Sequence, residues 1–356
     1  MKPKKHELKA VDFFCSAGGI TNGFRKAGIK VLGGIDVDDE CKDSYEYNNP
    51  GSIFINSDIK KLTFDELKNK LKLKLDDDNL IFIGCSPCQY WSKIKTDKTK
   101  SNESKNLLND FMRFVEHFKP GFIVIENVPG ILRKIDESPL KFFLKFLKRE
   151  KYNFDHSVIN SCHYGVPQTR KRFLLIASRV SKVITLPIPD SAENIPNTFE
   201  FIGDYNTFPP IPSGHKDLSS FLHSSAKLNE LNLIRLSHTP IDGGNRLSYY
   251  HNKDIAITSH YNKTNFSDSY SRLFWKKPAP TITTRFNSIS NGRFAHPEQN
   301  RGLSLREGAT LQTFDLEYKF FGKNESIIAK QIGNAVPPIL AYKIAKSIIG
   351  NHLHGK

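Results

Sequence analysis

The sequence predicts an α/β protein that combines a mostly parallel, buried sheet with a smaller domain of irregular structure. Three observations lead to this class. The chain has 356 residues, more than one compact core usually holds. Its first half alternates short apolar runs with helical patterns, as parallel strands and their crossover helices do. From about residue 180 to 285 this alternation gives way to irregular sequence rich in proline.

The elements follow from apolar spacing. Apolar runs predict strands at 10–14, 30–36, 52–56, 79–85, 122–127 and 172–178. Helical spacing predicts helices at 18–28, 104–120 and 139–150, and prolines after a Gly-Asn turn predict the start of a last helix within 337–350. We therefore expect one domain of residues 1–179, completed by 325–356. A second domain with a hinge is expected in 180–324.

The composition restricts the partners and the compartment. A formal net charge of +15 favours a polyanionic partner, although a Lys-rich surface without such a partner is an equal alternative. The basic start lacks the apolar segment of a signal peptide, and no apolar run reaches the ~20 residues of a membrane helix. Five cysteines in a chain of this length indicate thiols in a reducing compartment, so we expect a cytoplasmic protein without a membrane segment.

Three predicted strands end in features that suit a nucleoside-type ligand. "DFFCSAGGITNGF" (12–24) runs from a strand through two glycines into a helix, which lets a ligand approach the backbone. Asp36 ends the second strand and Asp58 follows the third. Ligands of open α/β sheets bind beyond the carboxyl ends of the strands. The alternative is that the glycines serve only a tight turn.

Two further strand ends carry groups that suit catalysis. "GCSPCQYWS" (84–92) places Cys85 within a strand, where it would pack, and Cys88 in the following loop, where a nucleophile could act. A zinc site would need two more ligands, which the remaining cysteines do not supply in a second C-x-x-C. Glu126 in "IENVPG" reaches the same edge, unless it is a surface or capping acid.

The segment "GVPQTRKRF" (165–173) runs into a strand. The spacing predicts Gln168, Arg170 and Arg172 on one side of that strand. Two arginines on one side suit phosphate or base contacts. A solvated, charged start of a strand is the alternative.

The order of these motifs resembles that of the C5-cytosine-specific DNA methyltransferases of bacterial restriction-modification systems. The resemblance rests on "DFFCSAGG", "SPCQ", "ENV", "QTRKR", "PTITTR", "REGATLQTF" and "QIGNAVPP", and it covers nearly the whole chain. It implies a Rossmann-like S-adenosylmethionine-dependent methyltransferase fold with a smaller target-recognition domain. It also implies that the region between "QTRKR" and "PTITTR", about 180 to 280, reads the DNA sequence.

The resemblance also assigns roles to particular residues. It implies Cys88 as the nucleophile, Glu126 on the target base, and Arg170 and Arg172 in the catalytic pocket. Contacts with DNA are expected at Gln89, Ser92, Gln168 and Thr281. The residues expected around the cofactor are Phe14, Gly18, Gly19, Asp36, Val37, Asp58, Ile59, Pro87, Leu107, Asn334 and Ala335. The chain departs from the family pattern at Ser16, which replaces a glycine, and at Asp36, which replaces a longer glutamate.

The implied reaction transfers a methyl group from S-adenosylmethionine to C5 of a flipped-out cytosine in duplex DNA, with S-adenosylhomocysteine as product and no metal. We expect a monomer that acts on the same site as a cognate restriction endonuclease. Three alternatives remain open at this point. The chain could methylate cytosine in RNA, bind DNA without catalysis, or hold a metal or redox centre on Cys85 and Cys88.

Overall fold

The computed structural model describes residues 7–86, 106–133, 138–258 and 268–354. They form two compact units. Unit 1 consists of Met1–Asn160, Lys171–Pro189 and Val336–Lys356, and unit 2 consists of Ser161–Arg170 and Asp190–Ala335. The expected boundaries lie about ten residues away from these, and Ser161–Arg170 lies in unit 2 instead of the first domain. The functional roles expected of the two domains stay predictions.

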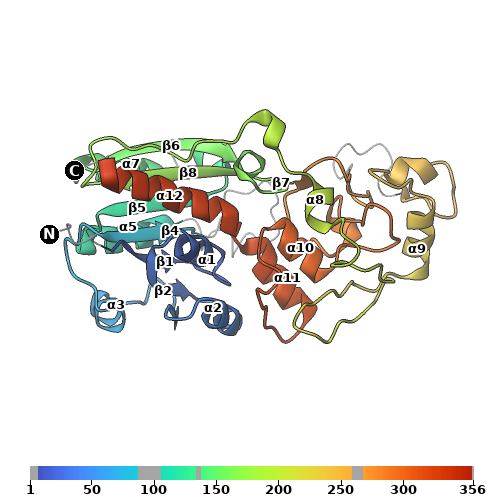
Figure 1. The fold of residues 1–356 in the computed structure, drawn as a ribbon, viewed down its shortest axis with the longest axis horizontal. Coiled ribbons are helices and arrows are strands. Elements are labelled where there is room, and N and C mark those ends of the chain that lie inside the picture. Colours follow the sequence, from blue (N-terminus) through green and yellow to red (C-terminus); the bar gives the residue numbers. More distant parts are fainter. Residues whose placement is uncertain (1–6, 87–105, 134–137, 259–267, 355–356) are drawn as a thin grey trace. The chain divides into compact units, whose positions relative to one another are not determined.

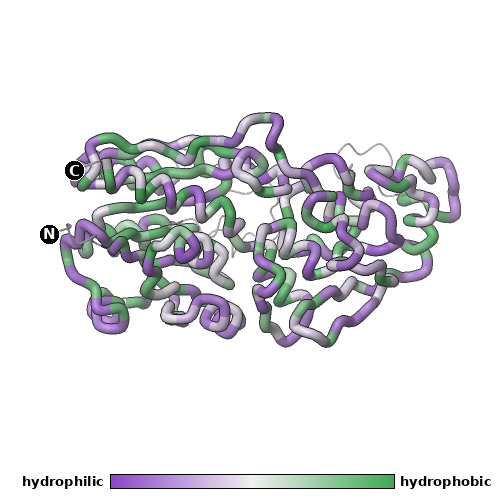
Figure 2. The backbone as a smooth tube through the Cα atoms, viewed as in Figure 1, coloured by the Kyte–Doolittle hydropathy of each residue, from purple (hydrophilic) through white to green (hydrophobic). Residues whose placement is uncertain are grey.

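Unit 1 contains a seven-stranded sheet in the order β3-β2-β1-β4-β5-β8-β6. The first five strands in this order are parallel, whereas β8 pairs antiparallel with both β5 and β6, so the sheet is mostly parallel as predicted. Its apolar strands stand out in Figure 2. The strands are β1 (Lys9–Phe13), β2 (Lys30–Asp36), β3 (Ile53–Asn56), β4 (Leu80–Gly84), β5 (Phe122–Asn127), β6 (Asn153–Asn160) and β8 (Lys171–Ser178).

The helices of unit 1 begin and end at the signals that the sequence provides. Thr63 and Glu66 form a capping box at the start of α3, and Ser138 caps α7 with Pro139 in its first turn. Lys119, in the left-handed conformation, ends α5 just before Pro120. The helices are α1 (Gly19–Lys26), α2 (Lys42–Asn48), α3 (Phe64–Leu71), α5 (Leu107–Phe118), α6 (Gly130–Arg133), α7 (Pro139–Arg149) and α12 (Pro338–His354).

Aromatic packing and one close helix pair hold these layers together. Phe13 of β1 meets Phe111 of α5 edge to face, with ring centroids 5.1 Å apart, inside a core that also contains Phe143 of α7. On α1, Gly23 approaches α12 so closely that an added Cβ would lie 2.4 Å from the carbonyl oxygen of Pro338. Figure 1 shows α12 beside α1. The C-terminal helix is therefore part of the first unit.

Unit 2 is irregular, as the sequence predicted, and buried arginines stabilise it. Its strands are β7 (Gln168–Thr169) and β9 (Ala279–Pro280), and its helices are α8 (Thr198–Ile202), α9 (Glu230–Ser237), α10 (Leu305–Leu311) and α11 (Glu325–Asn334). Arg272 is 1% exposed and donates to the carbonyl oxygens of Leu236, Thr239, His296 and Gln299. Irregular backbone leaves carbonyl groups without ladder partners, and Arg272 satisfies four of them.

Two local expectations are wrong. Gly333 and Asn334 form the end of α11, where the sequence predicted a Gly-Asn turn. The segment from Gln168 to Arg172 does not form one continuous strand. It divides into β7, which pairs with β9, and β8, which belongs to the seven-stranded sheet, so the expected common side of one strand does not exist.

Candidate functional site

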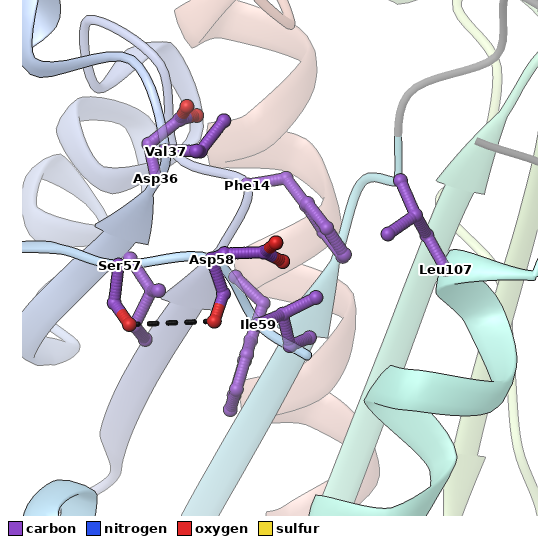
Figure 3. Close-up of a pocket in the computed structure, with 9 residues that line it drawn as sticks. Phe14, Asp36, Val37, Ser57, Asp58, Ile59 and Leu107 are labelled. Atoms are coloured by element: carbon purple, nitrogen blue, oxygen red, sulfur yellow. Dashed lines mark hydrogen bonds between the residues drawn. The ribbon is translucent and has the colours of Figure 1, made fainter. Parts of the chain in front are cut away.

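A pocket lies at the carboxyl ends of β1, β2 and β3. Ligands of open α/β sheets bind at this edge of the sheet. Figure 3 shows that Phe14, Ile59 and Leu107 supply apolar surface, while the carboxylate of Asp58 points toward Phe14. The lining residues are Phe13, Phe14, Ile35, Asp36, Val37, Ser57, Asp58, Ile59 and Leu107. The structure thus brings together six of the eleven residues expected around the cofactor.

The turn between β1 and α1 is strained where it borders this cavity. Phe14, Ser16 and Gly18 have positive φ angles of 65°, 47° and 90°. Such angles cost free energy in residues other than glycine, and they persist where neighbouring contacts fix them. Here the N–H of Phe14 donates to the carbonyl oxygen of Ile35 at 2.8 Å, and the N–H of Ser16 donates to Oδ2 of Asp36 at 2.8 Å.

Both carboxylate oxygens of Asp36 accept hydrogen bonds, one from the β1–α1 turn and one from the chain just after β2. Oδ2 accepts from Ser16, and Oδ1 accepts from the N–H of Asp38 at 3.0 Å. Burial raises the pKa of Asp36, while the two N–H donors oppose that rise. A carboxylate has about four acceptor positions, so each oxygen can accept one more hydrogen bond from a ligand hydroxyl.

The opposite side of the cavity comes from β3 and α5. Ser57, Asp58 and Ile59 follow β3, and Leu107 begins α5. Val37, directly after β2, is 70% exposed. An apolar side chain that is exposed at the edge of a cavity provides contact area for a flat, apolar ligand surface.

A second group of polar residues lies at the ends of β4, β5 and β8. Nε of Arg172 lies 2.9 Å from Oε1 of Glu126, and both side chains are largely buried. Nδ2 of Asn127 donates to the carbonyl oxygen and to Oγ of Ser86, each at 3.1 Å. This pair fixes the chain just before Pro87 and Cys88, which lie outside the described residues together with Gln89 and Ser92.

Cys85 lies one residue beyond β4, which ends at Gly84, and it is partly buried. Burial, and then the negative charge of Glu126, raise the pKa of its thiol well above the ordinary value. A protonated thiol is a poor nucleophile. These properties agree with the packing role expected of Cys85.

The expected site residues of unit 2 make internal contacts. Gln168 is fully buried, and its side-chain amide bonds the carbonyl oxygen of Leu311, the side chain of Gln312 and the N–H of Ile282. Arg170 donates to the carbonyl oxygens of Ile282 and Ala335 at 3.0 and 3.1 Å. These contacts order the backbone, and a DNA contact by Gln168 and a catalytic contact by Arg170 stay predictions.

The remaining expected residues of unit 2 differ in exposure. Oγ1 of Thr281 donates to the carbonyl oxygen of Thr169 at 2.8 Å. Asn334 is exposed and Ala335 is buried. Their expected contacts with DNA or cofactor stay predictions.

Sequence reasoning missed two supporting residues. Asp12 is buried under the β1–α1 turn, where its Oδ2 accepts from Oγ1 of Thr21 at 2.8 Å, and burial raises its pKa to about 7. Asn127 was missed although it directly follows Glu126 at the strand end. A polar residue within an apolar strand was the available signal in both cases.

The described residues contain neither a helix that could span a membrane nor a group of side chains arranged to hold a metal ion. No helix among them is long and apolar enough to span a membrane. Within the same residues, no group of three His, Cys, Asp or Glu side chains is arranged to hold a metal ion.

The fold is that of the Rossmann-like methyltransferases. The chain superposes on a crystal structure of a prophage-encoded Escherichia coli protein described as a DNA modification methyltransferase, with a TM-score of 0.71 and 19% identity. That match covers 97% of this chain and 99% of the other. At this identity the likeness supports the fold alone.

Sequence comparison gives the family. The model of the C-5 cytosine-specific DNA methylase family matches residues 8–350. The Type II methylase M.HgiDII of Herpetosiphon aurantiacus is 35% identical over 95% of this chain and 94% of its own length. The Type II methyltransferase M1.HphI of Haemophilus parahaemolyticus is 29% identical over 96% of this chain and 87% of its own length. The chain belongs to this family and is a DNA cytosine-5-methyltransferase of the restriction-modification type.

Proposed function

We propose that the cavity binds S-adenosylmethionine and that the protein methylates C5 of a cytosine flipped out of duplex DNA, through a covalent bond between Cys88 and C6. The lining fits the cofactor in chemistry, because it combines carboxylates with apolar side chains. Asp36 would accept hydrogen bonds from the ribose hydroxyls, and Phe14, Val37 and Ile59 would contact the adenine. The positive end of α1, where Gly18 and Gly19 lie, would be near the methionine carboxylate.

When bound, S-adenosylmethionine supplies an electrophilic methyl group. C5 of cytosine is too weak a nucleophile to take it unaided, so the thiolate of Cys88 first adds to C6 and moves electron density to C5. C5 would then bond to the methyl carbon while the bond from that carbon to the cofactor sulfur breaks, with its electron pair staying on sulfur, so that S-adenosylhomocysteine leaves. A base removes the C5 proton, the electron pair of that bond restores the double bond, and the thiolate leaves C6.

Glu126 and Arg172 would stabilise the ring while it carries this charge. Glu126 would hold N3 and the exocyclic amine, and Arg172 would support O2. The ion pair between the two side chains fixes both before substrate binds, at the strand ends next to Ser86. This arrangement is the observation that carries the proposal, because Cys88 follows Ser86 by only two residues.

The DNA would be bound by the net positive charge, and flipping would cost a few kcal/mol of unstacking. The segment 180–280 would read the recognition sequence. We further propose a monomeric, cytoplasmic enzyme that protects the site of a cognate restriction endonuclease.

Duplex DNA carrying 5-fluorocytosine at the target tests the covalent step. Fluorine cannot leave as a proton does, so the adduct at C6 should be trapped after methyl transfer. Mass spectrometry should place the adduct on Cys88, and Cys88→Ala should abolish both adduct and methylation while keeping DNA and cofactor binding. Cys85→Ala is the matched control and should remain active. An adduct on Cys85, or turnover by Cys88→Ala, would exclude this mechanism.

A further inference from the structure

We propose that Arg113 is a positioning residue that holds two walls of the cofactor cavity at a fixed separation. One wall is the turn after β3, which contributes Asp58 and Ile59, and the other is α5, which contributes Leu107. Arg113 lies on α5 and does not line the cavity itself. The inference rests on the proposed function for the identity of the ligand.

The guanidinium of Arg113 joins α5 directly to this turn. Its Nη2 donates to the carbonyl oxygen of Ile59 and to that of Leu62, the latter at 2.8 Å. The turn also has its own hydrogen bonds, because the N–H groups of Lys61 and Leu62 donate to the carbonyl oxygen of Asp58 at 2.9 and 3.0 Å. Arg113 therefore contacts a turn that is already ordered and fixes its distance from α5.

Neighbouring rings hold the guanidinium in place. Its central carbon lies 4.5 Å from the ring centroid of Phe114 and 5.4 Å from that of Phe64. Phe64 is in turn stacked on His117, with centroids 4.1 Å apart. A planar guanidinium can stack on these rings while it donates to two carbonyls, whereas the lysine ammonium is a point charge on a flexible chain.

Loss of Arg113 should affect cofactor binding more than chemistry. The two carbonyl groups can turn to water if the turn moves away from α5, which would separate Ile59 from Leu107. That movement changes the shape of the cavity. It leaves Glu126 and Arg172, on other strands, in place.

Calorimetric titration of the full chain with S-adenosylmethionine, and separately with S-adenosylhomocysteine, tests this role. Arg113→Met should raise both Kd values about 10-fold, as loss of a hydrogen bond from a charged group does. The Kd values of Arg113→Lys should lie between those of Arg113→Met and those of the wild type. At saturating cofactor, kcat should stay near the wild-type value while KM for S-adenosylmethionine rises. If Arg113 had a purely structural role, its loss would lower Tm without raising KM selectively while kcat stays unchanged.

Arg149→Met is the matched control. Arg149 also contacts α5, through Glu116 at 2.7 Å, but it is 62% exposed and does not touch the turn. Arg149→Met should bind both ligands like the wild type. A loss of affinity equal to that of Arg113→Met would overturn the proposal. Wild-type affinity in the Arg113 variants, with affinity lost in Asp36→Ala, would also overturn it while leaving the proposed function intact. A wild-type protein that binds neither ligand would refute the proposed function and this inference together. Should Arg113→Met fail to fold, Arg113→Lys decides.

Discussion

Ser16 adopts a left-handed backbone conformation that favours glycine. Ser16 has a φ of 47°, and its N–H donates a hydrogen bond to Asp36. The left-handed conformation of Ser16 therefore helps to orient Asp36, the residue proposed to bind the ribose. The hydroxyl of Ser16 also lies 3.7 Å from Sγ of Cys41. The resemblance marked this serine as a departure from the family pattern, and the φ angle gives the physical reason for the usual glycine.

We predict that Ser16→Gly binds S-adenosylmethionine like the wild type. Glycine adopts the left-handed conformation without strain, so the N–H of residue 16 should still donate to Asp36 and the turn should keep its form. Ser16→Val should weaken binding, because a β-branched residue is a strong outlier at this φ angle. Titration calorimetry of both variants measures the difference. Equal affinities for the glycine and valine variants would show that the turn does not depend on this conformation.

At the scale of elements, the contact between α1 and α12 depends on a missing side chain. A Cβ on Gly23 would lie 2.5 Å from that of Ala341 and 2.7 Å from the backbone nitrogen of Tyr342. Neither helix can yield easily, since Ala341 is itself fully buried. The pair therefore sets the position of the C-terminal helix on unit 1.

We predict that Gly23→Ala lowers the free energy of unfolding by about 1–3 kcal/mol, the usual effect of overpacking a core. Gly350→Ala, on α12, is the control. Its added Cβ meets nothing within 4 Å, so this variant should be stabilised by up to ~1 kcal/mol through helix propensity. Urea unfolding of both proteins tests the pair. Unchanged stability of Gly23→Ala would mean that α12 can shift freely.

Sequence reasoning located those strands whose position follows from a run of apolar residues alone. The predicted strands of unit 1 are present within one or two residues, because buried parallel strands are almost continuously apolar. The strand β6 was missed because most of its residues are exposed. Asp36 and Asp58 of the cavity could be located from strand ends, whereas Phe14, Val37, Ile59 and Leu107 were expected only from the family resemblance. The internal roles of Gln168 and Arg170 could not be predicted, since their partners Leu311 and Ala335 are more than 140 residues away in sequence.

At the scale of the whole molecule, unit 2 contains a buried cluster that makes stability depend on pH. Nδ1 of His296 accepts hydrogen bonds from the N–H groups of Glu298 and Gln299, and burial lowers the pKa of His296 to about 4. Burial alone would raise the pKa of Glu307, but the charge and hydrogen bonds of Arg301 outweigh this effect and lower it to about 2.

Both shifts predict that acid destabilises the protein. The unfolded chain takes up a proton at His296 near pH 6.5, whereas the folded chain resists until about pH 4, so stability falls across that range. Glu307 adds a further loss from about pH 4.5 toward 2. Tm should therefore decline on acidification below pH 6.5, and His296→Gln should flatten the part of this decline above pH 4.5. An unchanged slope in that variant, with the exposed His238→Gln as control, would argue against this assignment.

We also predict that the recognition sequence can be exchanged between relatives. Replacing residues 180–280 with the equivalent segment of a relative that has another target should change the methylated sequence, because the proposed catalytic groups at β4, β5 and β8 lie outside this segment. Bisulfite sequencing of DNA from cells that express the chimera measures the result. An active chimera with the original specificity would contradict the prediction.

The placement of α12 in unit 1 has a consequence for synthesis on the ribosome. All seven strands of the sheet are translated by residue 178, but the helix that packs on α1 begins at Pro338. At about 5–20 residues per second, roughly 8–30 seconds separate these events. During that interval the nascent sheet presents the apolar surface that α12 will cover, so chaperone binding should be strongest while unit 2 is being translated.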